Sequence, residues 1–264
     1  MTVAPFDARA YQAALATRAV GRFLEYRPVV DTTMRLARRA AEEGAPHGSL
    51  VLADEQTAGR GRQGRAFLSP PGANLYFTLV LRGSTASLRH LPLAVPVAVC
   101  VAVRDEGVDA LVKWPNDIWV NGRKLSGMLI DAEGVGDSLT ALPGIGINVT
   151  TEFSHIPDLA SVATSIGAEL GRVVGREPLL ARVCNQLELL LEGPSEELRE
   201  RYRALSLILG KEVEVTGRDG HAFLGVAEEI EEDGALRVRR GGVVEVVHAA
   251  DVSLRPAGSL DPSR

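Results

Sequence analysis

The order of strand-like and helix-like segments is the feature of this sequence that most limits its fold. Strand-like runs, rich in β-branched and aromatic residues, come in groups, and helical patterns lie between or after these groups. Such a mixture without strict strand–helix alternation favours an α+β fold over a doubly wound sheet. The expected strands are 23–30, 49–54, 74–81, 110–114, 118–120, 127–132 and 139–149, and the expected helices are 8–19, 32–43, 88–104, 178–191 and 195–207.

Local signals mark two of the boundaries between these elements. Asp31 stands directly before the helical pattern 32–43, and Asp is a favoured N-cap residue, so Asp31 is predicted to cap this helix. The Asn121-Gly122 pair is typical of a two-residue hairpin turn. It predicts tight joining of the short strands on either side.

The most apolar segment of the chain, LPLAVPVAVCVAV, lies within 88–104. It is too short to span a bilayer, and we interpret it as a buried helix, with a buried strand as the alternative. The N-terminus lacks a secretory signal pattern, and Cys100 and Cys184 form no CxxC motif, which predicts free thiols in a reducing compartment. The five histidines show no metal-ligand spacing, so no protein-borne metal site is predicted. We expect a cytoplasmic protein that does not enter membranes.

The pattern of the sequence changes after Gly210, from long helical segments to short strand-like ones. Five short strand-like runs follow, separated by glycines, and this spacing predicts a small β-barrel. A domain boundary is therefore placed near Leu209. The predicted organisation is a main domain at 1–209, a barrel at 210–257 and a tail at 258–264.

A loop rich in arginine and glycine follows the expected strand 49–54. Three arginines (Arg60, Arg62 and Arg65) alternate with three glycines (Gly59, Gly61 and Gly64) in a chain of net charge -5. Glycine permits close backbone approach, and arginine matches carboxylates and phosphates. The loop therefore predicts an anion site. A solvated basic loop or an RNA contact is the alternative, but apolar strands on both sides favour an ordered, functional loop.

A second charged segment, KWPND, runs from Lys113 to Asp117. Pro115 restricts the backbone, so Lys113, Asn116 and Asp117 are expected in a rigid turn between strands, where they could supply a phosphate contact and a carboxylate for metal or proton handling. An ordinary β-turn is the alternative. Lys124 follows the Asn121-Gly122 turn, ordinarily as a solvated edge residue.

Three glycines in later strands predict a place where a ligand comes close to the sheet. Gly127 lies three residues after Lys124, and Gly144 and Gly146 share one face of the apolar strand GIGINV, in line with Asn148. Glycines weaken a strand unless something must approach it, so these positions predict a flat floor. Close packing of a helix above the strand is the alternative.

Taken together, these segments resemble the biotin protein ligases. The resemblance covers Asp31-Thr32-Thr33, EQTAGRGRQGR, SPPGANLYF, VKWPNDI, GRKLSGMLI and GIGINV in order, and GKEVEV to DVSLR resembles the C-terminal barrel of the family. It implies a mixed-sheet catalytic domain like that of lipoate ligases and class II synthetases, followed by an SH3-like barrel. It also implies that biotin and ATP, with Mg²⁺, form biotinyl-5'-AMP, and that biotin then passes to one lysine of a biotin carboxyl carrier protein or domain.

The resemblance also implies a role for each matching residue. Those implied or expected to contact biotin are Thr32, Thr33, Gln56, Arg60, Gly61, Arg62, Lys124, Gly127, Gly144 and Gly146. Those on the ATP side are Arg62, Arg65, Lys113, Asn116, Asp117, Asn148 and Arg255. The catalytic set is Lys124, Asp117, Arg62 and Lys113, with Lys124 bridging the biotin carboxylate and the α-phosphate, and Asp117 orienting or deprotonating the acceptor lysine.

The chain departs from the family pattern at a few positions. Thr32 replaces a common Ser and keeps its hydroxyl, Met34 replaces a commonly polar residue, and Phe67 replaces a common Trp. About thirty residues precede the Asp-Thr-Thr motif, too few for the DNA-binding module of some members, so no DNA contact is expected. The resemblance also implies a homodimer through paired sheet edges. A lipoate ligase and a non-catalytic biotin or adenylate sensor are the rival interpretations.

Overall fold

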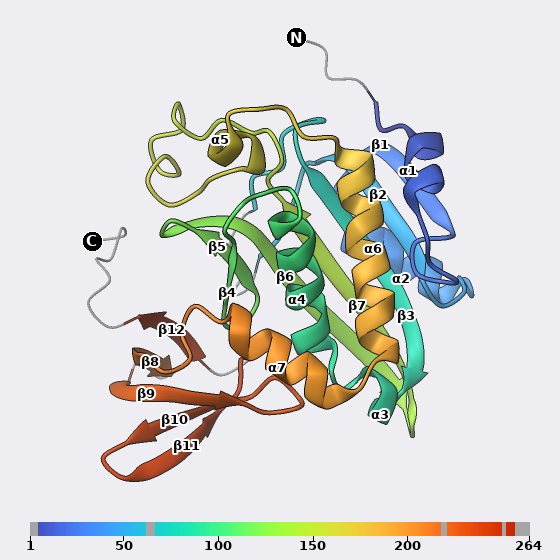
Figure 1. Cartoon of the computed structure of the whole chain (residues 1–264). Coiled ribbons are helices and arrows are strands. Elements are labelled where there is room, and N and C mark those ends of the chain that lie inside the picture. The colour runs from blue at the N-terminus through green and yellow to red at the C-terminus, as the bar shows by residue number, and fades with distance from the viewer. Residues whose placement is uncertain (1–4, 62–66, 218–220, 250–251, 257–264) are drawn as a thin grey trace.

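The computed structural model describes residues 5–61, 67–217 and 221–249, together with the backbone of 252–256. A seven-stranded mixed sheet with its helices forms the larger part, and a five-stranded antiparallel sheet forms the smaller one (Figure 1). The mixture of grouped strands and helices confirms the predicted α+β class.

The large sheet has the strand order β1-β2-β3-β7-β6-β5-β4. Strands β1 and β2 pair in parallel, and every other neighbouring pair is antiparallel. The predicted Asn121-Gly122 turn joins β5 to β6, and Asn121 has a positive φ of 48°, as such a turn requires. The strands are β1 (Leu24–Val30), β2 (Ser49–Gln56), β3 (Leu75–Ser84), β4 (Leu111–Lys113), β5 (Asp117–Val120), β6 (Arg123–Val135) and β7 (Ser138–Ile147).

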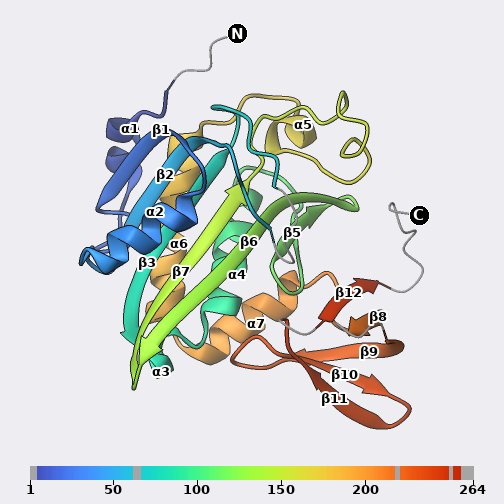
Figure 2. The ribbon, with the colours of Figure 1, turned by 180° about the vertical axis from the view of Figure 1, so that it is seen from behind.

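Helices cover the two faces of this sheet unequally. Figure 1 shows α4 and α6 across one face, with α7 beside α4, whereas Figure 2 shows α2 on the opposite face. Ala37 of α2 packs with Val51, Val80 and Leu142 of the sheet in a small second core. Part of this second face, next to the N-terminus of α2, is left for the site. The helices are α1 (Ala8–Ala14), α2 (Thr33–Glu42), α3 (Thr85–Leu88), α4 (Leu91–Arg104), α5 (Ile166–Leu170), α6 (Arg176–Glu192) and α7 (Ser195–Leu205).

The apolar segment predicted as a buried helix is α4, which confirms the helix over the strand alternative. Its first turn holds Pro92, where a missing backbone N–H costs no helical hydrogen bond. By length and composition, Thr85–Arg104 would suffice to cross a bilayer, yet 67% of its most apolar window is buried inside the protein. A helix that is apolar all round is expected in a core, and α4 occupies that place.

The prediction that Asp31 caps α2 is wrong. The N-cap residue is Thr32, in extended conformation, and the Asp31 carboxylate instead accepts the Thr32 backbone N–H at 2.7 Å and pairs with Arg35. The Arg35 side chain lowers the pKa of Asp31. The short helices α3 and α5 were also not predicted.

The small sheet forms the SH3-like unit that the sequence predicts, with the strand order β11-β10-β9-β8-β12. Alternation along β8 turns Val213 and Val215 inward, and both belong to the same buried cluster as Leu93 of α4. The core therefore runs without a break from the large sheet into the small one. The strands are β8 (Glu212–Gly217), β9 (Ala222–Ile230), β10 (Leu236–Arg240), β11 (Val243–Val247) and β12 (Val252–Pro256).

Candidate active site

One row of cross-strand partners crosses the open face of the large sheet. Cross-strand partners point to the same face, so a row with two charged residues at one end and two glycines beside them places ions next to a low part of the sheet surface. From edge to centre the row consists of Lys113, Asp117, Gly127, Gly146, Tyr76 and Ala53.

Lys124 reaches this face because of an irregularity in the pairing of β5 with β6. Gly127 pairs with Asp117, whereas Lys124 pairs with Trp119, so β6 has one residue more than β5 over the same span. Without this bulge, Lys124 and Gly127 would point to opposite faces. With it, the Lys124 Nζ lies 2.7 Å from the Asp117 Oδ1, and two predicted catalytic residues meet.

The backbone of Lys124 is clamped from outside the sheet. Its N–H donates to the Val162 carbonyl at 2.8 Å, and its carbonyl accepts the Thr164 N–H at 2.9 Å. Asn148, predicted on the nucleotide side, donates its side-chain amide to the Thr164 carbonyl at 3.0 Å. The buried Asn148 therefore supports the segment that holds Lys124 in place.

Lys113 lies at the end of β4 and belongs to the same cluster. Its Nζ lies 3.6 Å from the ring centroid of Trp119. Asn116, in the turn between β4 and β5, donates its side-chain amide to the Met128 carbonyl and accepts the Met128 N–H at 3.0 Å. The KWPND turn is thus fixed to β6, and the side chain of Asn116 has a structural task there.

The N-terminus of α2 contributes a polar group on the same face. The Gln56 Oε1 accepts the Thr33 backbone N–H at 2.9 Å and the Thr33 hydroxyl at 3.2 Å, and the Gln56 amide donates to the Ser69 hydroxyl at 3.2 Å. The Thr33 and Thr78 hydroxyls lie 2.9 Å apart. Thr33 and Gln56 are thereby brought together, with Thr32 as the adjacent N-cap residue, and Ser69 and Thr78 join them without having been predicted.

Two side chains lie over the predicted glycine floor. A Cβ added at Gly144 would meet the Met34 Sδ at 2.5 Å, and one added at Gly146 would meet the Phe67 ring at 2.6 Å. The helix alternative applies over Gly144, because Met34 belongs to α2, whereas the ring over Gly146 comes from a loop. A ligand on these glycines would share its space with Met34 and Phe67, two positions where the chain departs from the family pattern.

The two ends of the arginine-rich loop are pinned together. The Phe67 N–H donates to the Gly59 carbonyl at 3.0 Å, and a Cβ at Gly59 would lie 2.7 Å from the Phe67 carbonyl oxygen, so only glycine fits. Arg60 is exposed and Gly61 is half-buried next to this closure. Arg62 and Arg65 lie outside the described residues, and for Arg255 only its backbone position in β12 is described.

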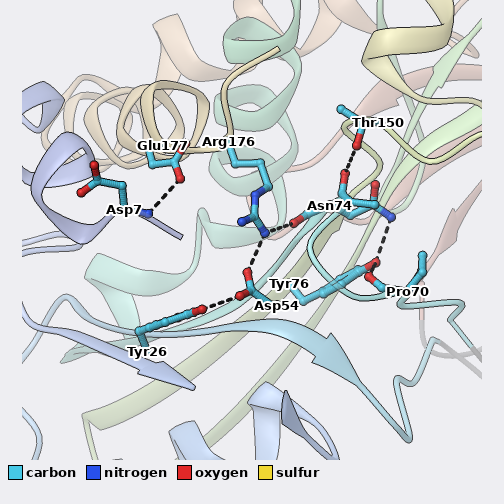
Figure 3. Close-up of polar contacts among 10 residues, drawn as sticks. Asp7, Tyr26, Asp54, Pro70, Asn74, Tyr76, Thr150, Arg176 and Glu177 are labelled. Carbon is cyan, nitrogen blue, oxygen red and sulfur yellow. Dashed lines mark hydrogen bonds and ion pairs between the residues drawn. The ribbon is translucent and has the colours of Figure 1, made fainter. Parts of the chain in front are cut away.

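A buried ionic network behind the floor was missed by sequence analysis (Figure 3). Arg176, at the start of α6, donates to the Asp54 Oδ1 at 2.6 Å, and Tyr26 donates to the other carboxylate oxygen. Arg176 also reaches the Asn74 carbonyl, and the Asn74 amide donates to the Tyr76 hydroxyl at 2.8 Å. Burial raises the pKa of Tyr76, so its hydroxyl stays protonated and donates onward to a loop carbonyl.

This network ties α6 to the loop between β2 and β3, which carries Ser69. Asp54 and Arg176 are far apart in the sequence, and the one signal available was a carboxylate at the end of an apolar strand, which must find a partner if it is buried. No sequence pattern pointed to Arg176 as that partner.

Comparison with known proteins agrees with this geometry. The chain matches the Biotin/lipoate A/B protein ligase family over residues 26–148 and the Biotin protein ligase C terminal domain over residues 208–255. The first match contains the whole cross-strand row together with Lys124 and Gly144, and the second ends at Arg255.

Several relatives cover most of the chain. The bifunctional ligase/repressor BirA of Bacillus subtilis is 31% identical over 91% of this chain and 76% of its own length. The biotin–[acetyl-CoA-carboxylase] ligase of Paracoccus denitrificans is 32% identical over 79% of this chain and 91% of its own. The biotin protein ligase of Aquifex aeolicus, solved with biotin and ATP, superimposes with a TM-score of 0.74 at 28% identity, covering 89% of this chain and 100% of that one. The chain therefore belongs to the biotin protein ligase family.

Proposed function

We propose that this protein activates biotin with ATP and transfers it to a lysine of a carrier protein. The observation that carries the proposal is the meeting of Lys124 and Asp117 beside Gly127, on the sheet face that also carries Gly144 and Gly146. Family membership supports biotin as the acid, since relatives at about this level of similarity are named biotin ligases.

In the first step, a biotin carboxylate oxygen attacks the α-phosphorus of ATP, and pyrophosphate leaves. Both reactants are anions, so cations that are already in place lower the cost of bringing them together. Lys124 is assigned to the biotin carboxylate and the α-phosphate, and Lys113 to the phosphates. Arg60, Arg62 and Arg65 are assigned to the same anions from the loop, as the family pattern suggests.

Thr33 and Gln56 are assigned to the polar end of biotin. Their network supports this because it holds hydroxyl and amide groups at the N-terminus of α2, on the face that carries the glycines. Gly61, Thr32, Gly144 and Gly146 complete the proposed biotin contacts, and Asn116, Asn148 and Arg255 the proposed ATP contacts.

Mg²⁺ is proposed to arrive with ATP. Within the described residues, no group of three or more His, Cys, Asp or Glu side chains is suitably placed for a metal. Mg²⁺ commonly needs only one or two carboxylates in addition to nucleotide phosphates, and Asp117 is the carboxylate of the row. The phosphates of ATP are therefore proposed to supply most of the Mg²⁺ ligands that do not come from the protein, and Asp117 the carboxylate.

In the second step, a neutral lysine amine of the carrier domain attacks the acyl carbon of biotinyl-5'-AMP, and AMP leaves. The amine must lose a proton, and Asp117 is the proposed acceptor. The carrier is proposed to be a biotin carboxyl carrier protein or domain.

Biotin-dependent release of pyrophosphate from MgATP, followed by labelling of a carrier domain with labelled biotin, tests the proposal. Lys124→Ala should abolish release, because it removes the bridging cation. A parallel reaction with lipoate separates the two ligase classes, and biotin binding without pyrophosphate release would favour the sensor. Labelling that depends on lipoate alone would refute the assignment.

Three further expectations stay predictions that need their own measurements. The buried, free Cys100 and Cys184 support a cytoplasmic location, which localisation in cells would test. Dimerisation through an outer strand, β1 or β4, is checked by sedimentation with and without biotinyl-5'-AMP. A DNA-binding assay checks the expected lack of DNA contact.

A further inference from the structure

Strand β5 offers two side chains on the ligand face, and each holds a lysine from a neighbouring strand. Asp117 holds Lys124 of β6 through an ion pair of 2.7 Å. Trp119, two residues further along β5, lies under Lys113 of β4, whose Nζ is 3.6 Å from the ring centroid. Lys113 and Trp119 are diagonal neighbours, since Lys113 pairs with Asp117 and Leu111 with Trp119.

We propose that Trp119 is a positioning residue, which holds the Lys113 ammonium at the phosphate end of the site. The proposal rests on the proposed function, because it requires that Lys113 contacts ATP. An ammonium over an aromatic face is attracted by the ring quadrupole. A carboxylate at position 119 would also attract Lys113, but it would add a negative charge where ATP must bind. The indole ring restricts the lysine side chain without adding that charge.

The surroundings of Trp119 fit a role through its ring. Trp119 is half-buried and pairs directly with Lys124 across β5 and β6, so its strand position lies next to both lysines of the site. Its indole N–H is buried and has no hydrogen-bond acceptor within the described residues. Replacement by Phe therefore removes no hydrogen bond seen here, yet keeps an aromatic face.

The test measures biotin-dependent exchange of pyrophosphate into ATP for two substitutions. Trp119→Leu should raise the KM for ATP by roughly 3- to 30-fold, the ratio that corresponds to a partly desolvated cation–π contact. Trp119→Phe should leave the KM for ATP close to the wild-type value. The Kd for biotin should be unchanged in both variants. An unchanged KM for ATP in a folded Trp119→Leu protein would overturn the proposal.

A double-mutant cycle with Lys113→Ala separates positioning from general packing. If Trp119 acts through Lys113, Trp119→Leu should change the KM for ATP by less than about twofold once Lys113 is gone. The full effect of Trp119→Leu in the Lys113→Ala background would show that Trp119 acts independently, and the proposal would fail. Absence of biotin-dependent exchange in the wild-type protein would instead remove the proposed function.

Fluorinated tryptophan placed at position 119 keeps the test open if Trp119→Leu does not fold. Fluorine withdraws charge from the ring face with little change of shape, so the KM for ATP should rise with each added fluorine. A KM for ATP that does not change across the fluorinated proteins would overturn the proposal.

Discussion

Lys124 faces the proposed ligand because a single extra residue interrupts the pairing of β5 with β6. Gly127 then matters as much as the lysine. A Cβ at this position would lie 2.8 Å from the Lys124 Nζ and 3.5 Å from the Asp117 Oδ1, which is the space that the ion pair uses. Absence of a side chain at one residue thus sets the position of a charge on another.

Gly127→Ala should therefore slow adenylate formation more than it destabilises the fold. The flexible end of Lys124 can move away at little cost, but a displaced cation of this kind loses on the order of 10- to 100-fold in rate. The measurement is pyrophosphate release beside a thermal unfolding curve. Gly193→Ala is the control, because its added methyl would also make a tight contact, 3.1 Å from the Leu189 carbonyl oxygen, but lies outside the row. Equal rates for the two variants would contradict the role given to Gly127.

Glu188 of α6 sets the stability of the turn that precedes β1. Burial alone would raise the pKa of its carboxyl, but the backbone N–H groups of Val20, Arg18 and Ala19 donate to it and together lower the pKa below 4.5. A carboxylate with a lowered folded-state pKa stabilises the fold above its unfolded pKa, and this stabilisation is lost as the pH falls through the folded value.

Glu188→Gln should lower the free energy of unfolding by about 1 kcal/mol at pH 7, because it takes the charged acceptor from backbone N–H groups that are exposed or partly buried. Below pH 4.5 the gap between wild type and variant should close as Glu188 is protonated. Urea unfolding at several pH values measures this. A gap that is independent of pH would mean that the charge of Glu188 has no part in it.

At the level of elements, the N-terminus of α2 is held by a side chain of strand β2. Its N-cap residue, Thr32, makes no side-chain capping bond, and Gln56 at the end of β2 accepts the Thr33 N–H instead. The first turn of the helix and the end of β2 are therefore one unit.

Gln56→Ala should destabilise the protein by about 1 kcal/mol, the usual cost of losing a helix cap, and should also weaken biotin binding. Gln56→Glu is the matched variant: it keeps an acceptor oxygen and adds a charge that a helix N-terminus favours. Its thermal midpoint should return to the wild-type value or above. Chemical denaturation and biotin titration of both variants check this, and equal loss of stability in the two would exclude capping by Gln56.

The sequence predicted the elements better than their details. Each expected strand exists within a few residues of its predicted ends, because periodicity reports which face is buried. The capping of α2 was wrong, since the Asp31 carboxylate found Arg35 and the Thr32 N–H instead. The bulge in β6 could not be predicted, because register depends on strands that come from elsewhere in the chain.

Across the whole molecule, motif spacing predicted the cluster of Lys113, Asp117 and Lys124, but not how the fold supports it. The Asp54–Arg176 pair and the clamp on Lys124 join segments distant in sequence, and no local pattern records such contacts. The positions of Gly144 and Gly146 were predicted, but not that Met34 and Phe67 come to them from two other segments. Local sequence thus specified the chemistry, whereas tertiary packing specified its support.

Contacts at the KWPND turn and at the start of α4 join the small sheet to the large one. Trp114, the residue after Lys113, donates its indole N–H to the Gly234 carbonyl at 2.9 Å in the turn between β9 and β10. Arg89 pairs with Glu232 of the same turn at 3.0 Å, and a Cβ on Gly234 would meet Pro92 of α4 at 2.6 Å. The small sheet therefore rests on the turn that carries Lys113 and Asp117.

Trp114→Phe should loosen this contact while keeping a ring in the core. Loss of one partly buried hydrogen bond predicts a decrease of about 1 kcal/mol in the free energy of unfolding, together with faster proteolysis of the link 206–211 between α7 and β8. Trp119→Phe is a matched control, because it removes an indole N–H that has no acceptor within the described residues. If both variants resisted protease and denaturant equally, the hydrogen bond to Gly234 would not be what holds the small sheet against the KWPND turn.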